Sequence, residues 1–588
     1  MAGDAFPMDP SELATWLRVR RYAVPGWMIE AAGRCRAAGD WRGACAAAHV
    51  DVDLDLDRIG RKFGARLVER LTEDLRQLVP DLVRWHAPRA LSGLSSLAKN
   101  HVLVLARYQE SSARHGAVTL RLETPRTAHG PQRLTLVCSL GPYADKSADR
   151  GSRTVTVVDW TELRHLWNSR YTGYLRQRLG GDRRTPFFHP DGTALTAEEL
   201  PTGPAPTSPA AHTEWVSGLV YQRSIEPFAR ALADAGFEVS RKPLKTRWGF
   251  TIDPLQNLRP LRLAALTCLD TEFSYAFGGR HDGRSDDLVT QAKIHLGEGW
   301  YAQLTRHRRE RTPPMAISLV EHEQVKKLPE LPEGHWRQPV DLHLLRQGRI
   351  TPAQLHPLVR QSLFPAWAGP AGLGESDQRR GTAGCGAAAG TELPAFEPVR
   401  VRCGSQWHQV SFRDGRLAAP HTPQEHEREN ALRALGGPGS GCFAVRRRVA
   451  GGPGQVPWRL REQIVDLFER ALHGDLPAVL RLLDAGIDPA VRGSRGRTLL
   501  HTVHLFDDPE PLLSRLLASG LEIDALDQDS RPPLHVAIAE FGSPATIRAL
   551  LAAGARTDIA EPVWGGLPGL VRYCDRADLD FLVNRPGG

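Results

Sequence analysis

The sequence predicts a multidomain protein in which mixed α+β N-terminal and middle domains precede a C-terminal, all-α repeat solenoid. Three observations predict this fold class. At 588 residues the chain exceeds the roughly 250 to 300 residues at which single hydrophobic cores stop growing. Apolar residues recur every three or four positions before residue 98 and every two positions from about residue 100, which indicates helices followed by strands. Near the C-terminus one phrase occurs three times at a fixed period, as stacked repeats do.

A small helical domain is predicted over residues 1–98. Within it the apolar side chains recur at the spacing of one helix face, in the series Phe63, Leu67, Leu71, Leu75 and Leu78. Pro80 interrupts this pattern, because proline lacks the backbone donor that a helix interior needs. The pattern restarts at Leu82, so more than one helix is expected here.

Residues 99–200 are predicted to form an α+β domain. Four runs, HVLVLARY, AVTLRLE, RLTLVCSL and TVTVVDW, are rich in β-branched residues or leucine and are separated by turn-forming segments. We expect four strands, largely antiparallel, followed by a helix over 161–181 with Thr161 as its N-cap and Gly180 at its end. The proline-rich stretch 201–213 is expected to be a linker.

A second α+β domain is predicted over 214–368. It begins with a helix over 214–238, continues through strand-like pieces around WGFTID, EFSYAFGG and WYAQLTRH, and closes with a helix over 350–365. The following stretch, 369–396, has almost no large apolar side chain, so burial cannot compensate for the entropy of ordering it. We therefore expect this stretch to be a flexible linker.

A small hairpin-helix-strand module is predicted over 397–458. Two alternating runs within 399–421 flank the sequence RDGRL, whose Asp-Gly pair is typical of a hairpin turn. A helix over 423–437 is expected next, followed by a strand with the sequence CFAVRRRV, 442–449.

The net charge of +8 says little about function. Only 8 of the 75 basic residues are lysine, and this preference for arginine is typical of a GC-rich genome such as that of an actinobacterium. The clusters RHRRER at 306–311 and VRRRV at 445–449 are short, so a solvated surface explains them better than a track for phosphates. We therefore expect no nucleic-acid partner.

The chain is expected to be cytoplasmic. Its 8 cysteines include no C-x-x-C pair, and its first residues, MAGDAFPMDPSELATW, lack the pattern of a secretory signal. Free thiols in a reducing compartment are the simpler interpretation. No run of about 18 apolar residues occurs, so no membrane partner is expected.

The sequence carries no complete catalytic motif. The glycine-rich stretch 436–442, GGPGSGC, has Cys442 and Phe443 where a phosphate-binding loop requires lysine and then serine or threonine. Neither G-x-S-x-G nor H-E-x-x-H occurs. A polar group within 277–287 comprises His281, Asp282, Asp286 and Asp287. Polar loops commonly contain such groups, so no catalytic residue and no small-molecule ligand are predicted, and a non-enzymatic function is favoured.

Five potential metal ligands lie within about forty residues: Cys403, His408, His421, His426 and Cys442. Structural zinc sites usually bring their ligands in close pairs, such as C-x-x-C or H-x-x-x-H, so that one turn presents two of them. His421 and His426 approach such a spacing, whereas the two cysteines do not pair. Zinc is therefore one alternative and buried thiols beside exposed imidazoles are the other; the second is favoured, so no metal and no cofactor are predicted.

The C-terminal quarter of the chain repeats itself. The stretches RLLDAGIDP, RLLASGLEID and ALLAAGARTD belong to three copies of one pattern. Positions 34 residues apart are Val479, Leu513 and Ile547, the leucine pairs beginning at Leu482, Leu516 and Leu550, and Gly486, Gly520 and Gly554. A helix is expected to end at each of these glycines, and each repeat is expected to bury its apolar face against its neighbours.

These copies resemble ankyrin repeats. That family is marked by a turn, a helix start of the form G-x-T-P-L-H-x-A, and a second helix that ends in L-L-x-x-G-A. The matching residues are Gly496, Thr498, Leu500 and His501 in one copy and Pro533, Leu534, His535 and Ala537 in the next. The departures are Leu499 for proline, Val503 for alanine, Ser530 for glycine and one extra residue per period. The resemblance covers about 460–585, within an expected ankyrin domain of 459–588.

The resemblance implies structural histidines and a protein-binding stack. In ankyrin repeats the signature histidine hydrogen-bonds backbone around the turn, which is the role expected for His501 and His535. Ankyrin domains bind other proteins through their turn tips and inner helices. The residues at those positions here are Ser494, Arg495, Arg497, Leu505 and Phe506 in one repeat and Gln528, Asp529, Arg531, Ala539 and Glu540 in the next.

Two functions remain open on the sequence. The favoured hypothesis is a cytoplasmic interaction protein, or scaffold, that binds a protein partner through its ankyrin-like repeats. The alternative is an enzyme or nucleic-acid effector in residues 100–365, which the repeats regulate or target. A deep pocket with convergent polar groups in the middle domains would favour the alternative.

Overall fold

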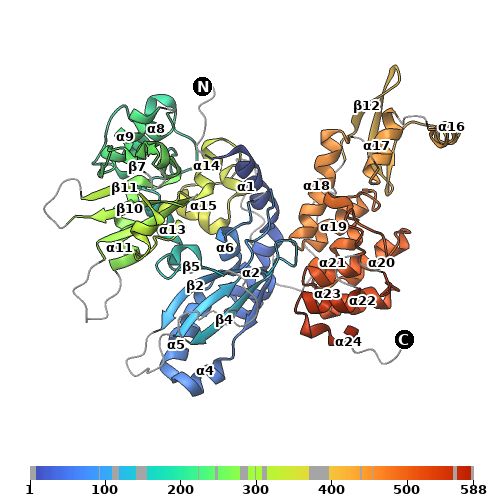
Figure 1. Cartoon of the computed structure of the whole chain (residues 1–588), viewed down its shortest axis with the longest axis horizontal. Helices are drawn as coiled ribbons and strands as arrows, with labels where there is room; N and C mark the ends of the chain where they lie inside the picture. Colours follow the sequence, from blue (N-terminus) through green and yellow to red (C-terminus); the bar gives the residue numbers. More distant parts are fainter. Residues whose placement is uncertain are drawn as a thin grey trace. The chain divides into compact units, whose positions relative to one another are not determined.

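The structure is a computed structural model and divides the chain into two compact units. It describes residues 8–91, 93–108, 118–140, 155–222, 224–245, 249–278, 289–297, 299–307, 314–369, 396–436, 440–452, 455–559 and 566–583. Unit 1 comprises Met1–Gly93, His101–Glu123 and Leu134–Arg379, and unit 2 comprises Leu94–Asn100, Thr124–Arg133 and Arg380–Gly588. Both units contain helices and strands, as expected for a multidomain α+β protein (Figure 1). Most of the predicted linker 369–396 and of the polar stretch 277–287 lies outside the described residues.

The larger sheet of unit 1 has five strands in the order β1–β4–β3–β2–β5. They are β1 (Val50–Asp53), β2 (His101–Tyr108), β3 (Val118–Glu123), β4 (Leu134–Leu140) and β5 (Thr156–Asp159). The four predicted strands are confirmed, and β2, β3 and β4 are antiparallel neighbours. β5 instead runs parallel to β2, and β1, from a stretch predicted to be helical, runs parallel to β4.

Six helices precede or flank this sheet within the described part of unit 1. They are α1 (Pro10–Tyr22), α2 (Gly26–Ala37), α3 (Trp41–Ala47), α4 (Leu56–Phe63), α5 (Ala65–Gln77) and α6 (Pro80–His86). α5 buries Leu67, Leu71 and Leu75, which confirms the predicted apolar face. Gly64, with φ of 88°, separates α4 from α5, because few other residues adopt that conformation without strain.

The second sheet of unit 1 has four strands in the order β6–β11–β10–β9. They are β6 (Phe237–Val239), β9 (Gln291–Gly297), β10 (Trp300–Arg306) and β11 (Met315–Glu321), and a separate pair consists of β7 (Leu244–Lys245) and β8 (Thr251–Ile252). β10 is antiparallel to both of its neighbours, and β6 is parallel to β11. The helices of this part of the chain are α8 (Pro209–Val220), α9 (Ile225–Asp234), α10 (Pro254–Asn257), α11 (Leu269–Gly278), α12 (His322–Val325), α13 (Glu333–Trp336), α14 (Val340–Arg346) and α15 (Pro357–Leu363).

Four predictions for unit 1 are wrong in detail. The predicted helix 214–238 is divided into α8 and α9 and ends in β6, and α8 begins at Pro209, inside the predicted linker 201–213. The predicted strand EFSYAFGG is helical within α11 as far as Gly278. The predicted helix 161–181 is broken into η1 (Arg164–Leu166), η2 (Thr172–Tyr174) and the short α7 (Leu175–Arg178). Tertiary hydrogen bonding explains the break, because the Ser169 amide donates to the Gln77 carbonyl over 2.9 Å and Asn168 forms a bridge with Leu78.

Unit 2 contains a three-stranded hairpin module. Its elements are β12 (Val399–Cys403), β13 (Gln406–Arg413), β14 (Arg416–Ala418), α16 (Pro423–Ala434) and α17 (Gly441–Val449). The predicted Asp-Gly turn is confirmed, since Asp414 and Gly415 both have positive φ, at 51° and 72°. The prediction of a strand over 442–449 is wrong: α17 buries Cys442, Val445 and Val449, which are spaced as one helix face.

The C-terminal part of unit 2 is a series of short helices. They are α18 (Trp458–Leu472), α19 (Leu476–Asp484), η8 (Ser494–Gly496), η9 (Leu499–Leu505), α20 (Glu510–Ala518), α21 (Pro533–Ala539), α22 (Pro544–Ala552), α23 (Leu567–Tyr573), η10 (Ala577–Leu579) and α24 (Asp580–Val583). Each predicted glycine terminus follows a helix and has positive φ: Gly486 (97°), Gly520 (87°) and Gly554 (94°). Leu516 and Leu550 are fully buried, so the first leucine of these pairs faces the core.

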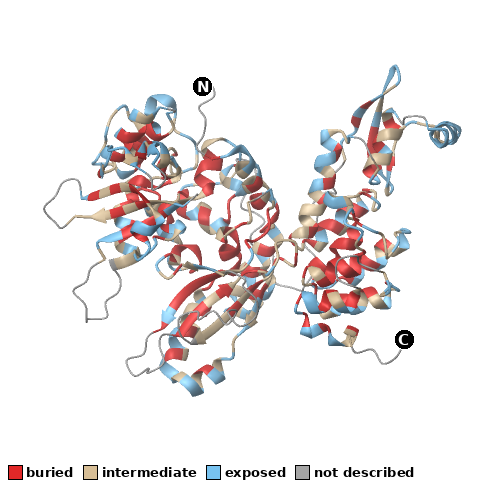
Figure 2. Cartoon of the chain, in the orientation of Figure 1, coloured by how far each residue is buried: buried red, intermediate tan, exposed pale blue. Residues whose placement is uncertain are grey.

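Burial is distributed differently over the elements of unit 2. One hydrophobic cluster joins the hairpin module to the helices of the repeats, for example Val410 and Val445 to Leu460 and Val479. By contrast, α16 has no buried residue, and most of its residues are exposed (Figure 2). Within the described residues of both units, no helix combines the length and apolar character needed to cross a membrane.

Candidate metal centre and predicted partner face

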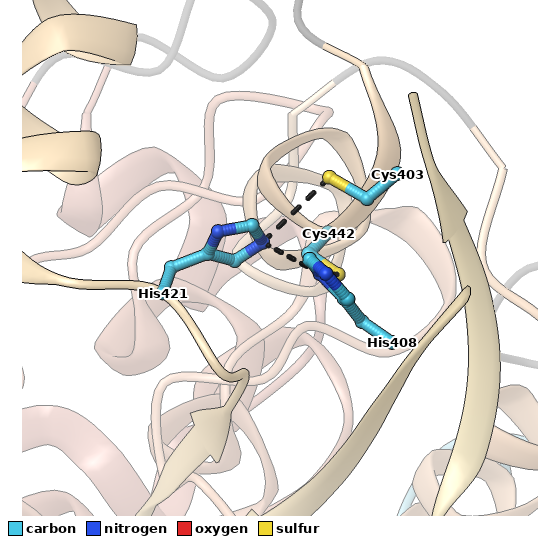
Figure 3. Close-up of side chains that lie close together, drawn as sticks. All are labelled: Cys403, His408, His421 and Cys442. Carbon is cyan, nitrogen blue, oxygen red and sulfur yellow. Dashed lines mark hydrogen bonds between the residues drawn. The ribbon is translucent and has the colours of Figure 1, made fainter. Parts of the chain in front are cut away.

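Four side chains of the hairpin module converge on one point (Figure 3). Cys403 ends β12, His408 lies on β13, His421 lies between β14 and α16, and Cys442 is the second residue of α17. One ligand atom from each lies within 4.8 Å of the ligand atoms of the other three. His426, the fifth residue considered from sequence, is not a member of this group.

Three separations between ligand atoms match the edges of a metal-centred tetrahedron. His408 Nδ1 and His421 Nε2 are 3.2 Å apart, Cys403 Sγ and His421 Nε2 are 3.6 Å apart, and Cys442 Sγ and His408 Nδ1 are 3.7 Å apart. Zinc bonds of about 2.3 Å to sulfur and about 2.0 to 2.1 Å to nitrogen give tetrahedral edges of about 3.3 to 3.8 Å. The spacing of these two sulfur and two nitrogen atoms is therefore typical of a zinc ion bound by two thiolates and two imidazoles.

The alternation of the hairpin places two of the ligands. Along β12 the buried positions are Val399 and Val401, and Cys403 continues the same face. On β13 His408 lies directly opposite Val401, on the face that Val410 continues. The ligand end of the hairpin is thus an extension of its buried face.

Gly441 allows Cys403 and Cys442 to come close. Its φ is 55°, and a Cβ at this position would lie 2.6 Å from Cys403 Sγ and 2.8 Å from Cys403 Cα. Any larger residue would push α17 away from the end of β12, so the sequence Gly-Cys brings the second thiol to the hairpin.

His421 is held from both sides of its ring. Nε2 faces the centre, and Nδ1 lies 3.5 Å from the carboxylate of Glu425, which also closes the capping box of α16 with Thr422. Phe443 covers the ring at a centroid distance of 4.4 Å. A carboxylate behind a histidine fixes its tautomer and orientation, as in metal sites whose ligand histidine donates outward.

The absence of a metal was predicted because the ligands lack close pairs in sequence. In the structure the fold brings the ligands together: the hairpin supplies Cys403 and His408, and α17 supplies Cys442.

Burial, together with the neighbouring Cys403 thiol, raises the pKa of the Cys442 thiol to about 11. The signal overlooked in the sequence is strand parity, which puts Cys403 and His408 on the hairpin's apolar face.

The residues predicted to bind a partner fall into two groups. Ser494, Arg495, Gln528 and Asp529 are exposed at successive turns, and the Gln528 amide donates to the Arg495 carbonyl over 2.8 Å. Arg531, half-buried, pairs with Asp529 at 2.6 Å. These turn tips form one continuous ridge.

The other predicted contacts face the interior of the unit. Leu505, Phe506 and Glu540 are buried, and Arg497 and Ala539 are half-buried. Arg497 donates two hydrogen bonds to the Glu540 carboxylate, at 2.7 and 3.2 Å. Burial alone would raise the pKa of Glu540, but His504 and Arg497 outweigh it and lower that pKa to about 2.

A segment from earlier in the chain covers this interior face. Residues 124–133 belong to unit 2, and a Cβ on Gly130 would lie only 2.3 Å from the Glu540 carbonyl oxygen. Arg126 lies over the Phe541 ring at 5.6 Å, and Arg133 pairs with Asp507 at 2.6 Å. Residues 124–133 thus cover part of the surface that the sequence analysis predicted to bind a partner.

The residues 94–100 reinforce this arrangement. Ser95 hydrogen-bonds Glu469 and lies 2.8 Å from His473 Nε2, both on or next to α18 of the same unit. Leu97 is fully buried, and its amide donates to Gln132 Oε1 over 2.7 Å. The two early segments are therefore joined to each other as well as to the helices.

His501 has the structural role expected for it. Its Nδ1 accepts from the Thr498 amide at 3.1 Å, and Nε2 lies 3.1 Å from the Arg531 carbonyl oxygen in the next turn. Burial lowers the pKa of His501 to about 4. His535 is also buried, and burial lowers its pKa, but neither of its ring nitrogens has a hydrogen-bond partner among the described residues, so the backbone hydrogen bond predicted for it is not found.

Unit 1 has a cavity of about 580 Å³ between the α7 region, α8 and α11. Its wall includes the buried Glu272, which accepts from Arg178 at 2.6 Å and lies 2.8 Å from His335 Nδ1. Tyr171, Tyr174 and Tyr275 are exposed around it. No sequence motif predicted this cavity, because the residues that line it come from four separated stretches of chain.

Comparison with known proteins adds no family to these observations. No protein-family model matches the chain, and no curated protein matches its sequence.

Proposed function

We propose that the chain is a cytoplasmic protein-interaction protein whose ankyrin-like repeats bind a protein partner through the exposed turn ridge. The ridge is defined as Ser494, Arg495, Gln528 and Asp529. The observation that supports this proposal is the continuity of the ridge: backbone hydrogen bonding between Gln528 and Arg495 fixes one tip against the next. Such a row offers a partner polar groups at fixed spacing, and arginine is enriched among interface anchors.

The buried positions are left out of this proposed interface. Phe506 is 4% exposed and Glu540 is 6% exposed, and Arg497 is occupied by Glu540. Replacing any of them would disturb packing within the unit, so lost binding in such a variant would not identify a contact. The ridge residues are free of this ambiguity.

The test compares two variants of the full-length chain as bait in its native host. Arg495→Asn with Gln528→Ala removes the two longest of the four ridge side chains. Asparagine is chosen because Arg495 has a φ of 57°, which asparagine tolerates. Arg572→Ala, at an exposed position on α23, is the control. A partner captured by the wild type should then bind the ridge variant at least about 30-fold more weakly in titration, as for a hot-spot loss of about 2 kcal/mol. Equal affinity for the ridge variant and the control would place the interface elsewhere.

The cavity of unit 1 favours a second candidate, an enzyme or effector in residues 100–365 with the repeats as its regulator. Its volume of about 580 Å³ and its buried Glu272 are features of ligand sites. Both oxygens of Glu272 already have partners, Arg178 and His335, which suits orientation of a ligand more than proton transfer. Thermal-shift screening of metabolites against the wild type and Glu272→Gln tests this candidate; a ligand that shifts only the wild type would support it.

A further inference from the structure

We propose that Cys403, His408, His421 and Cys442 bind one Zn²⁺ ion, which fixes the hairpin module as the cap of the repeat helices. This proposal is independent of the partner-binding function, because none of the four residues lies on the turn ridge. It follows from the convergence of two thiols and two imidazoles at tetrahedral spacing.

The donor set selects the metal. Two sulfur and two nitrogen donors in a tetrahedron suit zinc, whereas magnesium and calcium prefer oxygen ligands and more of them. Two thiolates balance the charge of the dication. All four positions are filled by protein atoms, and a closed set of this kind is typical of structural zinc rather than catalytic zinc, which keeps one position for water or substrate.

The positions of the ligands explain what the ion would do. They come from four places in the module: the end of β12, the start of β13, the loop before α16, and the start of α17. The module's own apolar interior is small, consisting mainly of Val399, Val401, Val410, Phe412 and Leu417 with one face of α17. Small folds with so little core usually require a metal or a disulfide.

The same module contacts the first repeat. The Arg492 amide donates to the carbonyl of Val449 at the end of α17 over 3.1 Å, and the Gly415 amide donates to the Gly486 carbonyl over 3.1 Å. A Cβ on Gly486 would lie 2.7 Å from the Asp414 amide nitrogen, so the hairpin turn sits directly on the end of α19. Terminal repeats need a unit that covers their apolar face. The ion therefore stabilises the cap, and through it the first repeat.

The first experiment measures zinc in the full-length chain. After purification without added metal and dialysis, mass spectrometry of the metal content should find about one equivalent of zinc per chain. Cys403→Ser with Cys442→Ser and, separately, His408→Gln should reduce zinc to background. Cys138→Ser and His426→Gln are the matched controls: Cys138 lies in unit 1, and the ring of His426 is 6.1 Å from that of His421 but outside the ligand group. Both controls should keep their zinc.

A second experiment avoids the risk that ligand variants fail to fold. Zinc is removed from the wild-type chain with a chelator under reducing conditions, and Co²⁺ alone is then added. Tetrahedral cobalt bound to two thiolates should give intense visible absorption and a sulfur-to-cobalt band in the near ultraviolet, and one equivalent of Zn²⁺ should abolish both. Thermal unfolding of unit 2 should shift to lower temperature on zinc removal and return when Zn²⁺ is restored.

Four results would each overturn the proposal. The first is a chain that holds far less than one equivalent of zinc even when Zn²⁺ is supplied, and the second is a cobalt spectrum that is octahedral and lacks the sulfur band. The third is ligand variants that retain as much zinc as Cys138→Ser and His426→Gln. The fourth is a Cys403–Cys442 disulfide in protein purified under reducing conditions, since the thiols would then be unavailable to the ion.

Discussion

His501 joins two successive turns of the repeat helices through both nitrogens of its ring. Nδ1 accepts from the Thr498 amide, so the proton of the neutral ring lies on Nε2, which donates to the Arg531 carbonyl. A second proton on Nδ1 would face the Thr498 amide hydrogen and break that hydrogen bond. The folded protein therefore requires His501 to be neutral, and burial, which lowers the pKa of this residue to about 4, agrees with that requirement.

We predict from His501 that unit 2 loses stability as the pH falls from about 6.5 towards 4. In the unfolded chain the ring has a pKa of about 6.5, so it takes up a proton there before it does in the folded chain. Stability is fully present above this range, and each pH unit within it costs up to about 1.4 kcal/mol.

The measurement is denaturant unfolding of full-length wild type and His501→Gln at several pH values between 7 and 4. The variant should have a smaller free energy of unfolding than the wild type near pH 7. This difference should shrink as the pH falls, because only the wild type loses the contribution of neutral His501. The other titrating groups are common to both proteins, so their effects cancel in the difference. A deficit that stays constant with pH would show that the protonation of His501 is not linked to folding.

At the level of single elements, sequence patterns predicted the strands and helix ends that local interactions determine. Period-two runs located β2, β3 and β4, and the 34-residue period located the glycines that end α19, α20 and α22. The strand predicted over 442–449 failed because Cys442, Val445 and Val449 follow helical spacing, which the run of arginines between them obscured.

Part of the candidate metal centre could be predicted from the sequence. The parity of Cys403 with Val401 places one thiol on the apolar face of the hairpin, and helical spacing places Cys442 on the buried face of α17. The two thiols come close only because α17 packs against β12, and local sequence patterns do not predict this tertiary contact. The covering of Glu540 by 124–133 had no sequence signal at all, because four hundred or so residues separate the two partners.

The contact between residues 124–133 and α21 gives an element-scale prediction. Gly130→Val should destabilise unit 2 by about 1 to 3 kcal/mol, since a side chain at Gly130 collides with the Glu540 carbonyl, which as backbone cannot move aside easily. Chemical denaturation of the full-length chain measures the loss. Gly203→Val is the matched control, because a Cβ there meets nothing within 4 Å. Equal effects of the two substitutions would mean that the segment does not pack on α21.

On the scale of the whole molecule, the chain does not build its units one after another. It leaves unit 1 for Leu94–Asn100, returns, leaves again for Thr124–Arg133, and enters unit 2 a third time after Arg379. The sequence analysis divided the chain into consecutive pieces, because composition and periodicity report on neighbours in sequence. Both early insertions are short and contain no regular element, so they carry no periodic pattern.

This interleaving predicts that a fragment consisting of residues 396–588 is incomplete. It would lack Leu97, which is fully buried in the whole chain, Ser95, which hydrogen-bonds Glu469, and Arg133, which pairs with Asp507. We expect the fragment with zinc supplied to unfold at a lower temperature than unit 2 does in the full-length chain, because removing the two segments exposes apolar surface and removes these polar contacts.

Thermal unfolding followed by circular dichroism compares the fragment with the intact chain, and a synthetic peptide covering residues 120–136 provides the complementary test. The peptide should raise the unfolding temperature of the fragment in a concentration-dependent way, as any ligand of the folded state does. A peptide with Gly130→Val should fail to do so, since its side chain would meet the Glu540 carbonyl. If the fragment is as stable as unit 2 in the whole chain, and neither peptide changes its unfolding temperature, residues 396–588 fold without the early segments.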